Sequence, residues 1–168
     1  CRLNVQRAPN MTYVSVIGLT RSRRTQICRQ FAQLERTKSR VPIYEFKKNG
    51  YCLFDLMDPE LLLEIRTNFQ YLKLSDMVIL LCDETDDVKQ KVEAIQAMLD
   101  GLKISAKLNV LVINKSSRVS EERLRLYQGL DDAEHVVIIG RRTNSIWDKV
   151  FEYHNKVDIY LKNGCLMV

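Results

Sequence analysis

An eight-residue stretch near the start of the chain, GLTRSRRT (18–25), follows an apolar run and has the outline of a phosphate-binding loop. A loop of the form G-x-x-x-x-G-K-[ST] needs its second glycine so that the backbone can approach the phosphates, and its lysine to reach the β- and γ-oxygens. Gly18 and Thr25 stand at the outer positions, but Arg23 and Arg24 replace the second glycine and the lysine. The stretch therefore predicts a vestigial loop in which Arg24 could still offer charge to a phosphate.

The other residue types that could do chemistry form no comparable pattern. The five cysteines are odd in number, show no C-x-x-C spacing and lie mostly in apolar runs, which indicates reduced, buried side chains. Only two histidines are present, so a histidine-rich metal site is not expected. The sequence predicts no catalytic residue and no metal ligand.

Short apolar runs rich in β-branched residues alternate with segments of helical length, which is typical of a mostly parallel sheet flanked by helices. Asn49-Gly50 indicates a hairpin between the second and third strands. The length of 168 residues suits a single α/β domain over 1–168, with an N-terminal extension over 1–11 and a six-stranded sheet. The expected strands are 12–18, 42–48, 51–56, 77–82, 108–113 and 135–139, and the expected helices are 24–37, 59–73, 85–102, 120–129 and 146–162.

The order of these elements resembles that of a small GTPase of the Ras superfamily over nearly the whole chain. A strand and a helix come first, then a hairpin, and then alternating helices and strands. The resemblance implies a three-layer α/β/α domain of the P-loop NTPase type with a guanine-nucleotide site. Within the superfamily, the segment AIQAMLDGLKISAKLNVLVINK (94–115) and the stretch from Thr143 to Asp148 are most similar to the Rag/Gtr GTPases.

Two further motifs of that family are present in altered form. Asp55 matches the metal-side aspartate of D-x-x-G, whereas Asp58 replaces the glycine whose backbone N–H meets the γ-phosphate. Asn114 and Lys115 match N-K-x-D, whereas Ser117 replaces the aspartate that recognises guanine, and a hydroxyl cannot reproduce a bidentate carboxylate acceptor. The resemblance therefore implies a vestigial nucleotide site made of Gly18, Arg23, Arg24, Thr25, Asp55, Asn114 and Lys115.

The net charge of +5 is unevenly distributed, because basic residues crowd the first third of the chain and few acids offset them. Such a surface attracts phosphate, nucleic acid, an anionic membrane or an acidic protein face, so an anionic partner is expected there. No apolar run reaches membrane-spanning length and no secretory signal is visible, which favours an intracellular location, cytoplasmic or nuclear. Cys165 fits C-a-a-X loosely, and a membrane partner is expected only if it is prenylated.

The altered motifs favour a pseudo-GTPase, a GTPase-like domain without GTPase activity that acts as a protein-interaction or scaffold module in a larger assembly. This interpretation requires no cofactor and no small-molecule substrate. One alternative is an unusual small GTPase switch that binds GTP or GDP with Mg²⁺. Another is an RNA- or ribosome-associated GTPase-like domain that uses its basic first third.

Overall fold

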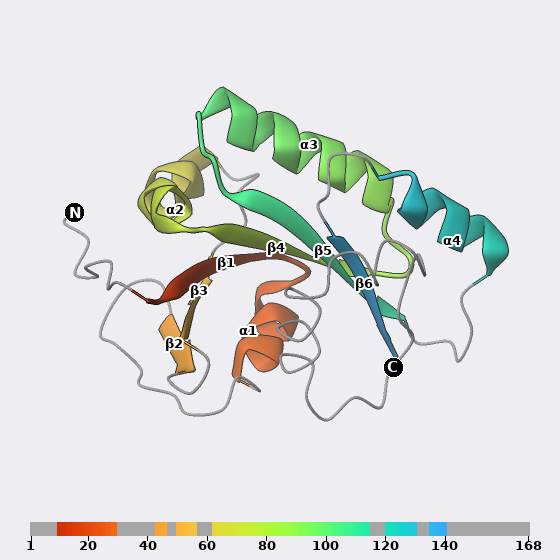
Figure 1. The fold of residues 1–168 in the computed structure, drawn as a ribbon, viewed down its shortest axis with the longest axis horizontal. Helices are drawn as coiled ribbons and strands as arrows, with labels where there is room; N and C mark the ends of the chain where they lie inside the picture. Colours follow the sequence, from red (N-terminus) through yellow and green to blue (C-terminus); the bar gives the residue numbers. More distant parts are fainter. Residues whose placement is uncertain are drawn as a thin grey trace.

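The sheet and the helices that cover it are seen in a computed structural model of the chain (Figure 1). The described residues are 10–29, 43–46, 50–56, 62–114, 120–130 and 135–140. The elements are β1 (Thr12–Gly18), α1 (Arg21–Arg29), β2 (Ile43–Phe46), β3 (Tyr51–Asp55), α2 (Leu62–Leu74), β4 (Met77–Asp83), α3 (Val88–Gly101), β5 (Lys107–Asn114), α4 (Glu121–Gln128) and β6 (His135–Gly140).

The strands lie in the order β2-β3-β1-β4-β5-β6. β1 pairs in parallel with both β3 and β4, so that Val16 lies between Asp55 on one side and Ile79 on the other. β5 continues the parallel sheet beside β4, and β6 pairs in parallel with β5. β2 runs antiparallel to β3, as the predicted hairpin requires. The prediction of an α/β fold with a parallel sheet is confirmed.

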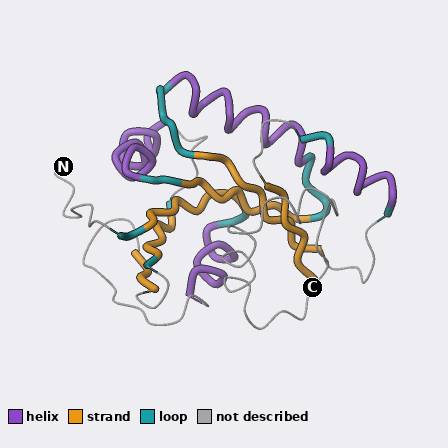
Figure 2. The backbone as a smooth tube through the Cα atoms, in the orientation of Figure 1, coloured by secondary structure: helices purple, strands orange, loops and turns teal. Residues whose placement is uncertain are grey.

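The helices cover both faces of this sheet. α1 lies on one face, where it contacts β1 and β3, and α2 and α3 lie on the opposite face (Figure 1). Figure 2 shows the strands, in orange, between these purple helices. Because both faces of the central strands are covered, β4 is buried along its whole length, and its sequence MVILLCD reads as a nearly continuous apolar run.

Of α2 and α3, on the face opposite α1, α3 is the one that the sequence predicted more clearly. Its buried side chains Val88, Val92, Ile95 and Leu99 recur at helical spacing and face the sheet. The helix begins at Val88 rather than at the predicted residue 85, because Asp87 caps it by accepting a hydrogen bond from the backbone N–H of the third helical residue.

The predicted start of the fourth helix is confirmed in the same way. Ser120 is the N-cap of α4, where its hydroxyl accepts a hydrogen bond from the Arg123 N–H at 3.3 Å. Glu121 and Glu122 follow in the first turn, near the positive end of the helix dipole. Several expected segments lie outside the described residues: residues 1–9 of the extension, 30–42 after α1, and the last helix at 146–162.

The cysteines in the described part of the chain are buried thiols, as predicted. Cys28, Cys52 and Cys82 are at most 1% exposed. Burial raises the pKa of the Cys82 thiol from 9.0 to about 12, with a further contribution from the Asp86 carboxylate. Across the described ranges, no helix combines the length and the apolar character that a bilayer crossing demands.

Candidate functional site

The candidate site lies where β1, β3 and β4 end at the same edge of the sheet. After β1 the chain passes to the β3 side of the sheet, and β4 lies on the other side of β1. In open α/β sheets, ligands bind outside the carboxyl ends of the strands, at the point where the chain connections lead to opposite sides of one strand. Gly18, Asp55 and Asp83 are the last residues of these three strands, so their surroundings decide what this edge can bind.

The connection between β1 and α1 contains only Leu19 and Thr20, because α1 begins at Arg21. Thr20 starts the helix: its carbonyl accepts a hydrogen bond from the Arg24 N–H at 2.9 Å, and its hydroxyl accepts one from the Arg23 N–H at 3.4 Å. The prediction that this helix starts at residue 24 was wrong by three residues. A threonine cap and the absence of a glycine at position 23 allow the helix to extend into the expected loop.

This early helix start changes what the backbone can bind. In a phosphate-binding loop, the residues between the two glycines curve around the phosphates and present their N–H groups. Here residues 21–23 have helical conformation. The backbone therefore does not form the loop that the glycine-and-lysine motif would make.

Gly18 has a role in the sheet that explains its identity without a phosphate. Its φ of +92° lies in the region that favours glycine. A Cβ atom built there would lie 2.2 Å from the carbonyl oxygen of Leu81, in the neighbouring strand β4. A glycine is thus required for β1 to end against β4.

Arg24 points into the protein and holds the end of β3. Its side chain is 3% exposed and that of Asp55 is 2% exposed. The Arg24 Nε donates to Asp55 Oδ1 at 2.7 Å, and one of its terminal nitrogens donates to the Gly18 carbonyl at 3.1 Å. The Thr25 hydroxyl donates to the other Asp55 oxygen, Oδ2, at 2.8 Å. Four of the seven predicted site residues thus form one network around the buried Arg24–Asp55 pair, and it uses both carboxylate oxygens.

The neighbouring Arg23 reaches in the other direction, to β4. Its guanidinium lies 2.7 Å from Asp83 Oδ2, with side-chain exposures of 39% and 11%. Asp83 Oδ1 also accepts a hydrogen bond from the Thr85 N–H at 3.3 Å. Asp83 was not among the predicted site residues, although its position as an acid at the end of a buried apolar strand was a signal for it. We refer to the Arg23–Asp83 and Arg24–Asp55 pairs together as the arginine clamp, because they tie α1 to the strands on both sides of β1.

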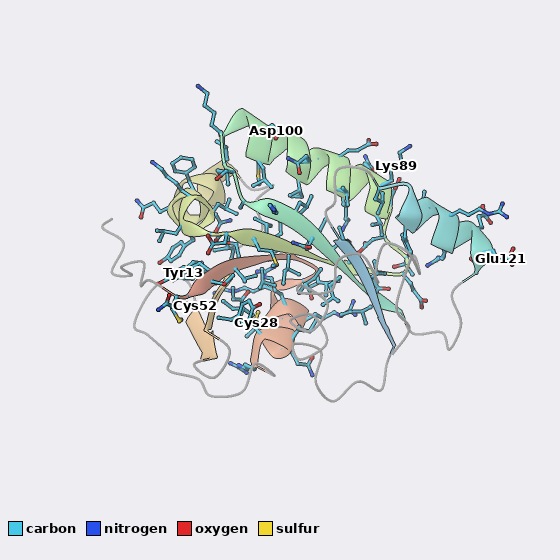
Figure 3. All side chains as sticks on the ribbon, in the orientation of Figure 1. Tyr13, Cys28, Cys52, Lys89, Asp100 and Glu121 are labelled. Atoms are coloured by element: carbon cyan, nitrogen blue, oxygen red, sulfur yellow. The ribbon has the colours of Figure 1, made fainter. Side chains whose placement is uncertain are left out.

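Cys28 lies one helical turn after Arg24 and faces the sheet (Figure 3). Burial raises the pKa of its thiol well above 9.0, and the Asp55 carboxylate raises it further, whereas the Arg24 guanidinium lowers it. The thiol therefore keeps its proton at neutral pH, and the thiolate is the form that reacts as a nucleophile. Cys28 is a packing residue beside the clamp.

The remaining predicted site residues are less fully described. Asn114 ends β5 and pairs in register with Gly140 of β6, whereas Lys115, Ser117 and Asp58 lie outside the described residues. The stretch from Thr143 to Asp148, which carried part of the resemblance, lies outside them too. Its backbone thus places Asn114 at the same edge of the sheet, on the strand next to β4, which carries Asp83 of the clamp.

The side chains at this edge do not fit a magnesium-bound nucleotide as they are arranged. Both oxygens of Asp55 and the hydroxyl of Thr25, the groups that would meet the metal in an intact site of this kind, bond to each other or to Arg24. Arg24, the group expected to meet a phosphate, is buried against Asp55. In the residues the structure describes, no group of three or more histidine, cysteine or acidic side chains is placed to hold a metal ion.

Comparison with known proteins leaves this geometry as the main guide to function. No protein-family model matches the chain, and no curated protein matches it.

Proposed function

We propose that the chain is a GTPase-like domain that does not use nucleotide and acts as a protein-interaction or scaffold module in a larger assembly. In this proposal its fold is the three-layer α/β/α fold of the small GTPases, of the P-loop NTPase type, with a six-stranded, mostly parallel sheet. The order of elements along the chain and the antiparallel β2 beside a parallel sheet support that assignment.

The observation that carries the proposal is the buried ion pair between Arg24 and Asp55. A nucleotide with its metal would have to separate this pair, since Asp55 cannot hold Arg24 and meet a metal with the same oxygens. Separating a buried ion pair costs about 3–5 kcal/mol when the remaining charge is left uncompensated. A metal ion on Asp55 would offset part of this penalty, so the corresponding loss of roughly two to four orders of magnitude in affinity is an upper bound. The first turn of α1 would also have to unwind to form a loop around the phosphates.

The exposed side of α1 is the surface that this proposal assigns to a protein partner. Arg21, Ser22, Gln26 and Arg29 are exposed along it, and the helix contains no acidic residue. An acidic face on the partner would complement it. The clamp holds this helix against the sheet from the other side, so the exposed side has a fixed orientation.

Nucleotide binding is the direct test. The purified chain would be extracted with acid and analysed for released guanine nucleotide, and then titrated with fluorescent GTP and GDP in the presence of Mg²⁺. We expect no co-purified nucleotide and no binding at micromolar concentrations. A variant with Arg23→Gly and Arg24→Lys, which restores the motif, serves as the matched control. Stoichiometric nucleotide in the unaltered chain, or micromolar affinity, would refute the proposal.

The same side of α1 favours one second candidate function, association with RNA. Exposed arginines on an acid-free helix are suited to phosphate contacts, which make binding strongly dependent on salt. Titration of a labelled RNA at several salt concentrations separates the two functions. A steep loss of affinity with salt that becomes shallower in Arg21→Glu/Arg29→Glu supports the RNA function, and an RNA affinity that is absent or unchanged by these substitutions excludes it.

A further inference from the structure

The oxygen atoms around Arg24 form a site with the chemistry of a cation site. The guanidinium contacts a carboxylate oxygen of Asp55 and the backbone carbonyl of Gly18, and the Thr25 hydroxyl lies on the second carboxylate oxygen. Carboxylate, carbonyl and hydroxyl oxygens are the ligands that hard cations take in proteins. These oxygens come from β3, β1 and α1, so a cation among them joins three elements.

The burial of Asp55 makes a positive charge necessary at this place. The carboxylate is 2% exposed, and a buried carboxylate is strongly disfavoured unless a cation compensates for its lost hydration. The Thr25 hydroxyl gives one hydrogen bond but no charge. Arg24 supplies the charge, and its Nε–H is directed at the carboxylate.

We infer that the guanidinium of Arg24 is the resident cation of this site, a covalently attached replacement for a separate cation. Because the group is attached to α1, it binds as an intramolecular partner at an effective concentration on the order of millimolar or higher. The link between α1 and the end of β3 is therefore permanent and does not depend on a ligand. The inference rests on the proposed function in one respect, namely that no nucleotide displaces Arg24.

The inference predicts that the site will accept a small guanidinium ion when the Arg24 side chain is removed. The full chain carrying Arg24→Ala would be titrated with methylguanidinium chloride at millimolar concentrations, with sodium chloride at equal ionic strength as the control, while its thermal unfolding is followed. Two matched proteins complete the design: the unaltered chain, whose site is already filled, and Arg24→Ala/Asp55→Asn, which has no carboxylate to compensate.

We expect a saturable rise in the unfolding temperature of Arg24→Ala, and no comparable rise in either matched protein. At a concentration of about 20 times Kd, the ratio of folded to unfolded protein should rise about 20-fold. The same shift in all three proteins, or no shift in a folded Arg24→Ala, overturns the inference.

The test remains decisive if Arg24→Ala does not fold in buffer alone. Recovery of the folded state is then followed by circular dichroism during the titration, and adding Asp55→Asn should restore folding without methylguanidinium, since no uncompensated charge remains. If neither treatment restores folding, the inference is overturned. Nucleotide binding by the unaltered chain would refute the proposed function and leave the methylguanidinium result interpretable by itself.

Discussion

Replacing Gly18 by alanine should destabilise the domain strongly even in the absence of any nucleotide. The added Cβ would lie 2.2 Å from the Leu81 carbonyl oxygen, whereas ordinary contacts lie at 3.4–4 Å, so β1 and β4 would have to separate where they meet. Overpacking of this kind costs about 1–3 kcal/mol. Alanine at a φ of +92° adds about 1–2 kcal/mol of backbone strain.

Together these effects predict a loss of about 2–5 kcal/mol in the free energy of unfolding. For a domain of this size the loss corresponds to a fall of about 4–20 °C in Tm. Urea denaturation of the full chain, followed by circular dichroism in nucleotide-free buffer, measures the free energy. Gly101, at the end of α3, provides the control, since a Cβ there meets nothing within 4 Å. Gly101→Ala should be neutral or stabilising by up to about 1 kcal/mol.

The reasoning would be refuted if Gly18→Ala lost no more stability than Gly101→Ala. That result would mean that the sheet does not require the glycine, and the first glycine of a phosphate loop would again be its best explanation. A large loss in nucleotide-free buffer assigns the glycine to the packing of β1 against β4.

Three further predictions concern the rest of the fold, all measured by urea denaturation. Asp87→Ala removes the N-cap of α3 and should lower the free energy of unfolding by about 0.5–2 kcal/mol. Lys89→Ala, at an exposed position of the same helix, should change it by less than about 0.5 kcal/mol. Equal losses in the two variants would show that Asp87 does not stabilise the helix as its cap. Leu99→Ala, at a fully buried position, should cost about 2–5 kcal/mol, and a loss below about 1 kcal/mol would mean that α3 does not pack as described. Because burial raises the pKa of Cys82 from 9.0 to about 12, the folded chain keeps this proton in a pH range where the unfolded chain releases it. The contribution of this thiol to stability is therefore complete below pH 9 and should fall by about 1.4 kcal/mol per pH unit between pH 9 and 12. The Cys82→Ala variant should show a correspondingly shallower decline, and an identical decline would contradict the assignment.

The strands and the buried side of α3 could be predicted from sequence because their signals are local. An apolar run such as that of β4 identifies a buried strand, and Val88, Val92, Ile95 and Leu99 identify one side of a helix. The start of α1 was harder, because the same residues fit two local structures. The stretch 18–25 fits a loop by its outline, and it also fits a helix capped by Thr20, which is what the structure contains.

The arrangement of the candidate site could be predicted only in part. Arg24 and Asp55 were both singled out, but as two halves of a nucleotide site rather than as partners of one another. They are 31 residues apart, and Arg23 and Asp83 are 60 residues apart. Such contacts depend on which strands are neighbours in the sheet, and no local pattern specifies that order. Gly18 was likewise singled out as the first glycine of a phosphate loop, whereas the structure requires a glycine there because of a carbonyl of β4.

The central position of β1 has a consequence for synthesis of the chain. Both neighbours of β1 come later in the sequence, and the contact between the Tyr13 N–H and Asp76 spans 63 residues. During translation, both edges of the β1 segment TYVSVIG therefore stay unpaired until β3 and β4 have been synthesised. An uncharged segment rich in β-branched residues is prone to aggregate in that state. The arginines that follow it directly can act as gatekeepers, since charges flanking such a segment oppose intermolecular pairing. Arg23 and Arg24 would thus protect the nascent strand from aggregation before they form their ion pairs with Asp83 and Asp55.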